Sequence, residues 1–187
     1  MKIFIGLVFW CFCSSAHAVL FDLNMNLDQG GFDHTNNIKT DSSIYQLGIY
    51  SLLGKNEGKN AVYLGWNIVS YSSKQTETSG QDLSLTSSDM GPSFRWQVKP
   101  QLFSLTYTYG IICKGKFSDT VVNEELNGTS HILKAAIEPQ ITDNYYLGFA
   151  LTYYAASYKT SLQNSTQSDI SSKSSKIYPS ISMSFRY

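Results

Sequence analysis

The sequence has little of the covalent or metal chemistry that holds many small exported domains together. Only three of its 187 residues are cysteines, and two of them, Cys11 and Cys13, lie in the apolar N-terminal stretch. The remaining thiol, Cys113, has no second cysteine to pair with, which excludes an internal disulfide framework. His, Asp and Glu residues show no metal-ligand spacing, so we expect neither a metal site nor a cofactor.

An excess of charge of one sign is also missing. Residues 1–18 contain one charged side chain, Lys2, and the rest of the chain has 13 Lys and Arg against 14 Asp and Glu. Because there is no basic run, nucleic acid has no electrostatic support as a partner. After residue 18 no apolar run approaches the 18 residues of a membrane helix, and helical periodicity is not convincing anywhere.

The N-terminal stretch MKIFIGLVFWCFCSSAHA predicts an export signal. Lys2 is followed by the apolar run Ile3–Phe12, and the sequence AHA at 16–18 has the small-x-small pattern of a cleavage site. The apolar run is about ten residues long, too short to cross a bilayer of roughly 30 Å. We therefore expect a cleaved signal peptide at 1–18 and a single domain at 19–187.

What the chain does contain is alternation of apolar and polar residues with a period of two. In the last segment, for example, Ile181, Met183, Phe185 and Tyr187 alternate with serines and Arg186. Such alternation predicts β-strands with one apolar face. Eight segments show it: Val19–Asp28, Ile44–Leu53, Ala61–Tyr71, Gly91–Val98, Leu102–Ile112, His131–Pro139, Tyr145–Ala156 and Ile177–Tyr187.

The connections between these segments alternate in length. Four are long and rich in Ser, Thr, Asn, Asp and Gly, at 28–43, 72–82, 113–130 and 159–176, and three are short, at 54–60, 99–101 and 140–144. Outer-membrane barrels have this asymmetry, with short periplasmic turns and longer extracellular loops. The sequence therefore predicts an all-β fold, an eight-stranded antiparallel up-and-down transmembrane β-barrel with four long extracellular loops.

The polar face of the strands is expected to line a narrow lumen. Glycines that relieve crowding fall on it, and so do Asp22, Arg95, Glu138 and Arg186, which antiparallel strands bring to one end of the barrel. Because the first and last strands are neighbours, we expect Asp22 and Arg186 to be able to pair directly. The glycines are Gly48, Gly65, Gly91, Gly110 and Gly148.

The apolar face carries aromatic side chains near strand ends, as interfacial aromatic residues do. Two prolines, Pro92 and Pro179, fall inside predicted strands and lack a ladder donor. Each is expected either at a bulge or beyond the membrane, with the second interpretation preferred for Pro179. The aromatic residues are Phe21, Tyr45, Phe94, Trp96, Phe103, Tyr109, Tyr145, Tyr153, Phe185 and Tyr187.

With this architecture and C-terminal pattern, the chain resembles the small eight-stranded outer-membrane β-barrels of Gram-negative bacteria, the OmpA/OmpX-like group. The resemblance covers 19–187. The alternation Ile181, Met183, Phe185 and Tyr187 looks like the family's terminal assembly signal, although Tyr replaces the usual Phe at the end. The resemblance implies a location in the outer membrane, outer-membrane lipid and lipopolysaccharide around the barrel, and recognition by the barrel-assembly machinery.

The favoured function is a structural or surface-interaction protein with a plugged lumen and an unknown extracellular ligand. A first alternative is a narrow pore or passage for small apolar compounds, and a soluble lipocalin-like barrel is a further one. A lipid A-modifying barrel enzyme would need a nucleophile beside a base. His34, Ser88 and Asp89 are the conceivable cluster, but solvated loop residues are the simpler interpretation, so we expect no enzyme.

Overall fold

A computed structural model of the chain describes residues 19–26, 31–33, 38–53, 60–77, 82–98, 102–119, 122–163 and 166–187. The expected signal peptide at 1–18 lies outside the described residues. In the part of the chain described, no helix is both long and apolar enough to cross a bilayer. The strands are β1 (Val19–Asn26), β2 (Gly31–Asp33), β3 (Ile38–Leu52), β4 (Asn60–Glu77), β5 (Asp82–Val98), β6 (Phe103–Ser118), β7 (Asn123–Ile137), β8 (Gln140–Thr142), β9 (Tyr145–Gln163) and β10 (Thr166–Arg186).

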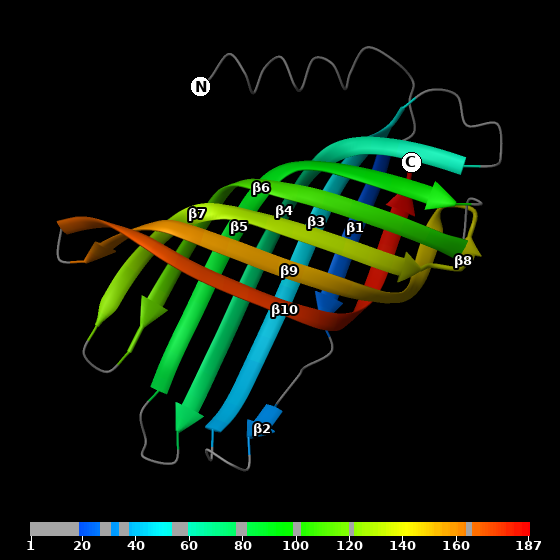
Figure 1. The fold of residues 1–187 in the computed structure, drawn as a ribbon. Helices are drawn as coiled ribbons and strands as arrows, with labels where there is room; N and C mark the ends of the chain where they lie inside the picture. The colour runs from blue at the N-terminus through cyan, green and yellow to red at the C-terminus, as the bar shows by residue number, and fades with distance from the viewer. Residues whose placement is uncertain are drawn as a thin grey trace.

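Eight of these strands form a closed ring. The hydrogen-bonded order is β1-β10-β9-β7-β6-β5-β4-β3, and β1 also pairs with β3, which closes the sheet. Every pairing is antiparallel. The two short strands lie outside the ring: β2 pairs with β3, and β8 pairs with β9. The predicted all-β, eight-stranded antiparallel barrel is therefore confirmed, and Figure 1 shows its long strands lying side by side.

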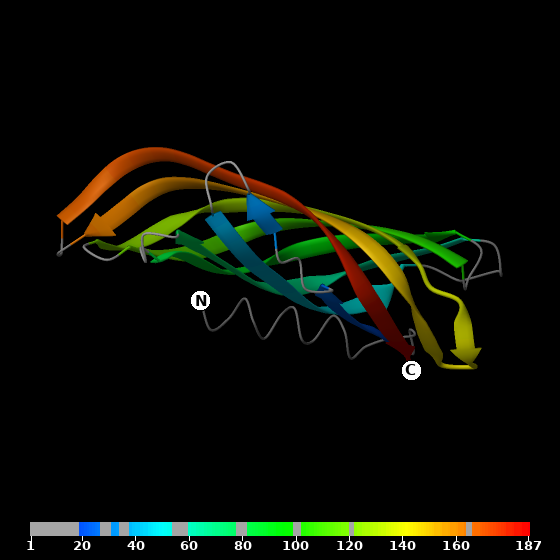
Figure 2. The same cartoon turned by 90° about the horizontal axis from the view of Figure 1, so that it is seen from below.

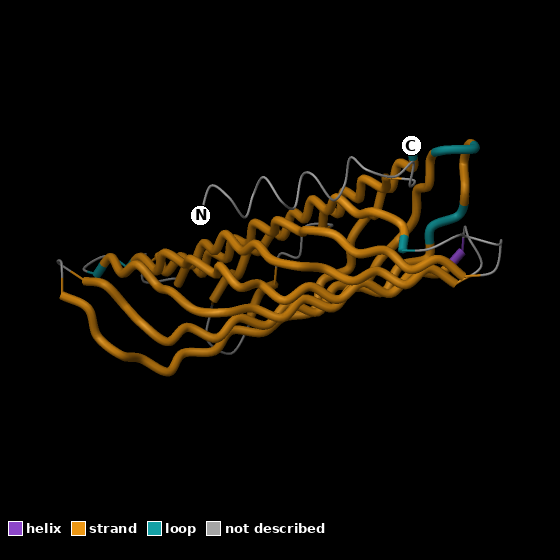
Figure 3. Tube along the Cα trace, turned by 90° about the horizontal axis from the view of Figure 1, so that it is seen from above, coloured by secondary structure: helices purple, strands orange, loops and turns teal. Residues whose placement is uncertain are grey.

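The two ends of the chain meet at one end of the barrel. The backbone N–H of Val19 donates to the carbonyl of Tyr187 at 3.0 Å, and the N–H of Tyr187 donates to Val19 at 2.8 Å. We call this the terminal end, and we call the opposite end, where β4, β6 and β9 finish, the distal end. Figure 2 shows β10 curving over the sheet toward the terminal end, and Figure 3 shows that strand makes up almost all of the described trace.

The predicted long loops at the distal end are mostly wrong. β4 continues to Glu77 before β5 begins at Asp82, and β9 reaches Gln163 before β10 begins at Thr166. The register continues through these polar segments, for example Ser73 opposite Leu85 and Lys173 opposite Ser157. Serine and threonine on both faces remove the apolar alternation but leave the backbone free to pair, so hydrophobic periodicity underestimates strand length there.

Side chains alternate between the two faces of the ring as predicted. Along β9 the even-numbered residues from Tyr146 to Tyr158 are buried, whereas Phe149 is 71% and Leu151 54% exposed. Large apolar side chains are exposed on every strand of the ring. Contiguous exposed apolar surface of this kind marks a contact with lipid or with another protein. The predicted aromatic residues face outward on these strands, with Tyr145 partly covered.

Glycines make room inside the barrel for one large ring. Tyr50 is fully buried, and its hydroxyl lies 3.2 Å from the Ser93 hydroxyl. A Cβ atom added at Gly48 would collide with the ring of Tyr50, and one at Gly65 would collide with Tyr50 and with the Ile49 carbonyl. Small residues on the inner face are thus required by crowding, as the sequence suggested.

The two prolines differ in their settings. Pro92 lies at a register shift between Met90 and Ser93 in the pairing with β6, in agreement with a bulge. Pro179 pairs in regular register with Leu151, between exposed Ile177 and Ile181, so it marks no bulge in the pairing with β9, and its place beyond the membrane stays a prediction. In the described ladder to β1 the last β10 partner is Ser180, which leaves Pro179 just outside that ladder.

Candidate functional site in the barrel lumen

Four charged side chains meet inside the terminal half of the barrel. Arg95 Nη1 lies 3.0 Å from Asp22 Oδ2, Arg95 Nη2 contacts Glu138 Oε2, and Lys134 Nζ contacts Asp22 Oδ2. All four side chains are at most 2% exposed, and their formal charges cancel. We call Asp22, Arg95, Lys134 and Glu138 the ion cluster. The ion cluster crosses the lumen between strands that are not neighbours in the ring. Its members come from β1, from β5, from β7 and from the residue that follows β7.

Serine hydroxyl groups form hydrogen bonds with the two carboxylates of the ion cluster. Ser104 donates to Glu138 at 2.8 Å, and the hydroxyls of Ser182 and Ser184 lie within hydrogen-bond distance of both Asp22 and Glu138. A buried ion pair is stable only when its remaining hydrogen-bonding capacity is also satisfied. The serines of the C-terminal strand donate to the carboxylates of the cluster, which gives the polar face of that strand a structural reason.

Sequence reasoning placed three of the four members correctly on the inner face but misassigned the fourth. Among the described residues no ion pair joins Asp22 to Arg186: Asp22 lies opposite Ser184, and Arg186 lies opposite Leu20, half-buried at the barrel end near Tyr63. Lys134 takes the expected place of Arg186. Lys134 lies on the inner face of β7, four residues before Glu138, and this even spacing was the pattern that could have identified it.

The middle of the lumen is filled by neutral polar side chains. Asn24 donates to Gln46 at 3.3 Å and to Thr152 at 3.0 Å. Across the barrel Asn67 donates to Thr108 at 3.0 Å, and the Ser93 and Thr108 hydroxyls are 2.8 Å apart. These buried groups join strands that are neighbours in the ring or are separated by a single strand.

The distal half of the lumen contains an aromatic and aliphatic core that the sequence did not reveal. The ring of Tyr71 stacks on Tyr154 with centroids 4.9 Å apart and meets Tyr178 edge-on at 6.0 Å. Ile44, Val69, Cys113, Leu126, Ile132, Ala156 and Tyr158 belong to the same buried cluster. Tyrosine has an amphipathic ring, so its presence on a face does not say whether that face meets lipid or lumen.

A small polar group is enclosed within this core. Ser87 donates to Asp89 at 2.7 Å, and Tyr154 donates to Ser87 at 3.2 Å. Cys113 lies beside this group with its side chain 2% exposed, and its sulfur is 3.8 Å from the Ser87 hydroxyl. Cys113 is therefore an inert buried thiol at neutral pH.

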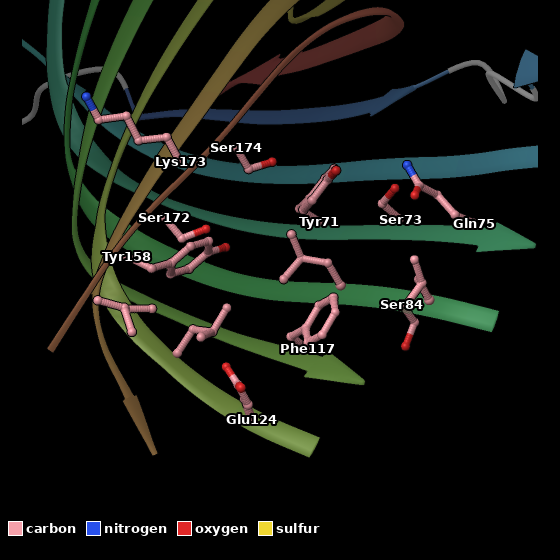
Figure 4. Close-up of a pocket in the computed structure, with 14 residues that line it drawn as sticks. Tyr71, Ser73, Gln75, Ser84, Phe117, Glu124, Tyr158, Ser172, Lys173 and Ser174 are labelled. Atoms are coloured by element: carbon pink, nitrogen blue, oxygen red, sulfur yellow. The ribbon is translucent and has the colours of Figure 1, made fainter. Parts of the chain in front are cut away.

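Above the core a cavity of about 440 Å³ is located within the distal end. We call it the vestibule. Its walls combine apolar side chains with Tyr71, Tyr158, Glu124 and several serines (Figure 4). The apolar members are Leu83, Leu85, Phe117, Leu126 and Ile170.

The residues of the conceivable catalytic cluster do not converge. Ser88 is exposed on the outer face of β5, whereas Asp89 is fully buried inside, as successive residues of a strand must be. His34 lies outside the described residues. Within the described ranges no three His, Cys, Asp or Glu side chains form a group that could hold a metal ion.

The chain is similar in structure to a solved outer-membrane protein. The crystal structure of the outer membrane protein OprG from Pseudomonas aeruginosa aligns with 92% of this chain and 96% of its own, at 10% sequence identity and a TM-score of 0.39. No protein-family model matches the chain, and no curated protein matches it. At this level of likeness nothing is carried over from OprG, and the barrel fold rests on the strand register described above.

Proposed function

We propose that this chain is an integral outer-membrane barrel protein whose lumen is plugged and whose role is structural or interactive at the cell surface. The observation that carries the proposal is the pairing of an apolar outer face on every strand of the ring with an ion cluster at most 2% exposed inside it. A soluble barrel would show the reverse arrangement. A closed ring also leaves no unpaired strand edge in lipid.

A plugged lumen is supported by the three successive layers of buried side chains that fill it. The ion cluster, the amide and hydroxyl layer around Asn24 and Asn67, and the tyrosine core are all buried. An eight-stranded barrel has interior space for side chains and little else. These layers support a plug over the alternative of a passage for small apolar compounds.

Fractionation tests the location and the fold together. After expression with its own N-terminal segment in a Gram-negative host, the protein is expected in the outer-membrane fraction, and it should migrate differently on a gel before and after boiling. Planar-bilayer recordings test the plug, with no reproducible conductance steps expected. Recovery in the soluble periplasm would contradict the membrane proposal, and stable steps would contradict the plug alone.

Outer-membrane glycolipid is the proposed partner around the distal half. Lys114 faces outward two positions beyond Ile112, the last exposed apolar residue of β6, with Ser88 and Asn127 as its cross-strand neighbours. A cation between two hydrogen-bonding side chains, just above an apolar belt, suits the phosphate of a lipid headgroup. Lys114→Gln should lower retention of radiolabelled lipopolysaccharide by the purified barrel, whereas the outward Lys159→Gln variant serves as a charge control.

The C-terminal pattern is the proposed signal for the assembly machinery. Ile181 and Phe185 are exposed on the outer face, so truncating Phe185 leaves the lumen intact. Phe185→Ala is expected to slow membrane insertion in cells more than spontaneous folding into lipid vesicles. Equal effects in both assays would assign the residue to stability instead.

A further inference from the structure

The vestibule has the volume and lining of a ligand site. Its volume of about 440 Å³ falls within the range of small-molecule pockets, and apolar side chains line it together with a few polar groups. Phe117, Leu85 and Ile170 pack against the tyrosine core beneath, so the floor is fixed by the folded barrel. The site requires only the closed barrel and does not depend on the proposed function.

One buried group in this floor has no partner. The Tyr158 side chain is 1% exposed, and its hydroxyl lies near the Ser87 and Tyr154 hydroxyls but meets neither of them with full hydrogen-bond geometry among the described atoms. Leaving a buried hydroxyl unpaired costs about 1–3 kcal/mol, and such groups call for an explanation. Gly115 lies against the Tyr158 ring, where an added Cβ would stand 3.0 Å from Cε1, so the backbone there fixes the position of the ring.

The charges inside the distal half favour a cation. Glu124 lines the vestibule and is held by a hydrogen bond from Ser161 at 2.9 Å. In Figure 4 the Glu124 carboxylate points toward the other lining side chains, whereas the Lys173 ammonium points away from them. Asp89 lies buried within the core below, and the one inward cation described nearby, Lys176, is held by Ser42 at 3.0 Å and does not line the cavity.

From these observations we propose that the vestibule binds a small organic cation that has an apolar, preferably aromatic, body. The apolar body packs against Leu85, Phe117 and Ile170, and the ammonium group lies between the Glu124 carboxylate and the faces of Tyr71 and Tyr158. Tyrosine faces attract cations within about 6 Å of the ring centroid. The unpaired Tyr158 hydroxyl accepts a hydrogen bond from the ammonium group.

A charge series of probes tests the proposal directly. The protein in lipid nanodiscs is titrated with 2-phenylethylammonium, with neutral 2-phenylethanol and with anionic 3-phenylpropionate, and methyl NMR shifts of Leu85 and Ile170 report binding. The cation is expected to bind with a Kd of about 1 mM or tighter, a value reasonable for its size. The alcohol should bind at least about threefold more weakly, and the anion more weakly still.

Neighbouring glutamates provide a matched control. Glu124→Gln should weaken binding of the cation about fivefold and leave binding of the alcohol unchanged, the size expected for a partly exposed charge pair. Glu125 faces outward on the same strand and is 62% exposed, so Glu125→Gln should change neither. Tyr158→Phe keeps the ring, and its removal of the hydroxyl should weaken cation binding about threefold.

Each remaining outcome overturns the proposal. Equal affinity for the three probes, equal effects of Glu124→Gln and Glu125→Gln, or no shift of the lining methyl groups up to 10 mM cation, about tenfold above the expected Kd, all contradict it. The gel shift on boiling confirms for each variant that the barrel is folded. Because the assay measures binding in any lipid environment, its failure leaves the outer-membrane proposal intact.

Discussion

Replacing Asp22 by asparagine removes one charge from the centre of the barrel and keeps the shape of the side chain. Asp22 Oδ2 lies 3.0 Å from Arg95 Nη1 and also contacts Lys134 Nζ, and none of the three side chains is more than 2% exposed. After the substitution, Glu138 alone faces two buried cations. Removing one partner of a buried ion pair costs about 3–5 kcal/mol, and we expect the free energy of unfolding to fall by that amount.

Urea unfolding of the protein in phospholipid vesicles, followed by tryptophan fluorescence, measures this loss. The double variant Asp22→Asn/Lys134→Met restores a neutral cluster and should recover at least half of it, since the excess cation is gone. Arg186→Gln is the control, because Arg186 lies outside the ion cluster, and it should change the stability by no more than about 0.5 kcal/mol.

Two results would refute this reasoning. A loss below about 1 kcal/mol for Asp22→Asn would mean that water or rearrangement compensates the buried cations, since exposed ion pairs have effects of that size. Additive losses in the double variant would mean that Asp22 and Lys134 act independently. Either result would remove the ion cluster as a coupled unit.

Three further predictions concern other layers of the barrel. Gly48→Val should lower the free energy of unfolding by about 1–3 kcal/mol, because the new side chain collides with Tyr50. In the same urea assay, adding Tyr50→Ala to this variant should relieve part of the loss. No recovery would mean that Gly48 is needed for another reason. Leu151→Lys puts a charge at an outward position whose side chain is 54% exposed. If this outer face meets lipid, the free energy of unfolding in vesicles should fall by about 2–4 kcal/mol, whereas a negligible change would mean that the face meets water. Cys113 should react with a maleimide at least about 100-fold faster in urea than in the folded protein, because its side chain is only 2% exposed in the barrel; rapid labelling of the folded protein would contradict this burial.

Much of the barrel could be predicted because its outer face has a simple requirement. Apolar residues at every second position mark each strand from Phe21 to Phe185, and the number of such segments gives the number of strands in the ring. The pattern did not predict the distal halves of the strands, because the Ser and Thr residues there can lie on either the inner or the outer face. Pairing in that region depends on the neighbouring strand rather than on the local pattern.

The candidate sites, too, could be predicted from the sequence only in part. Parity along the strands assigned Asp22, Arg95 and Glu138 to the lumen, but it could not decide which charges meet, because a long side chain at a barrel end can turn to solvent. Arg186 does so in part, and Lys134 from β7 reaches Asp22 across the lumen instead. The vestibule likewise needs Glu124, Phe117 and Tyr158, which come from three strands and share no local motif.

The sequence by itself determined the period of two, the two faces and therefore an antiparallel barrel, since these follow from the direction of successive side chains along a strand. Only the tertiary structure decided the contents of the lumen: a neutral ion cluster near Val19 and Tyr187, a tyrosine core, and an open vestibule at the distal end. The physical reason is that these layers join strands that are distant in the chain. Their composition depends on register and shear around the ring, which no single segment contains.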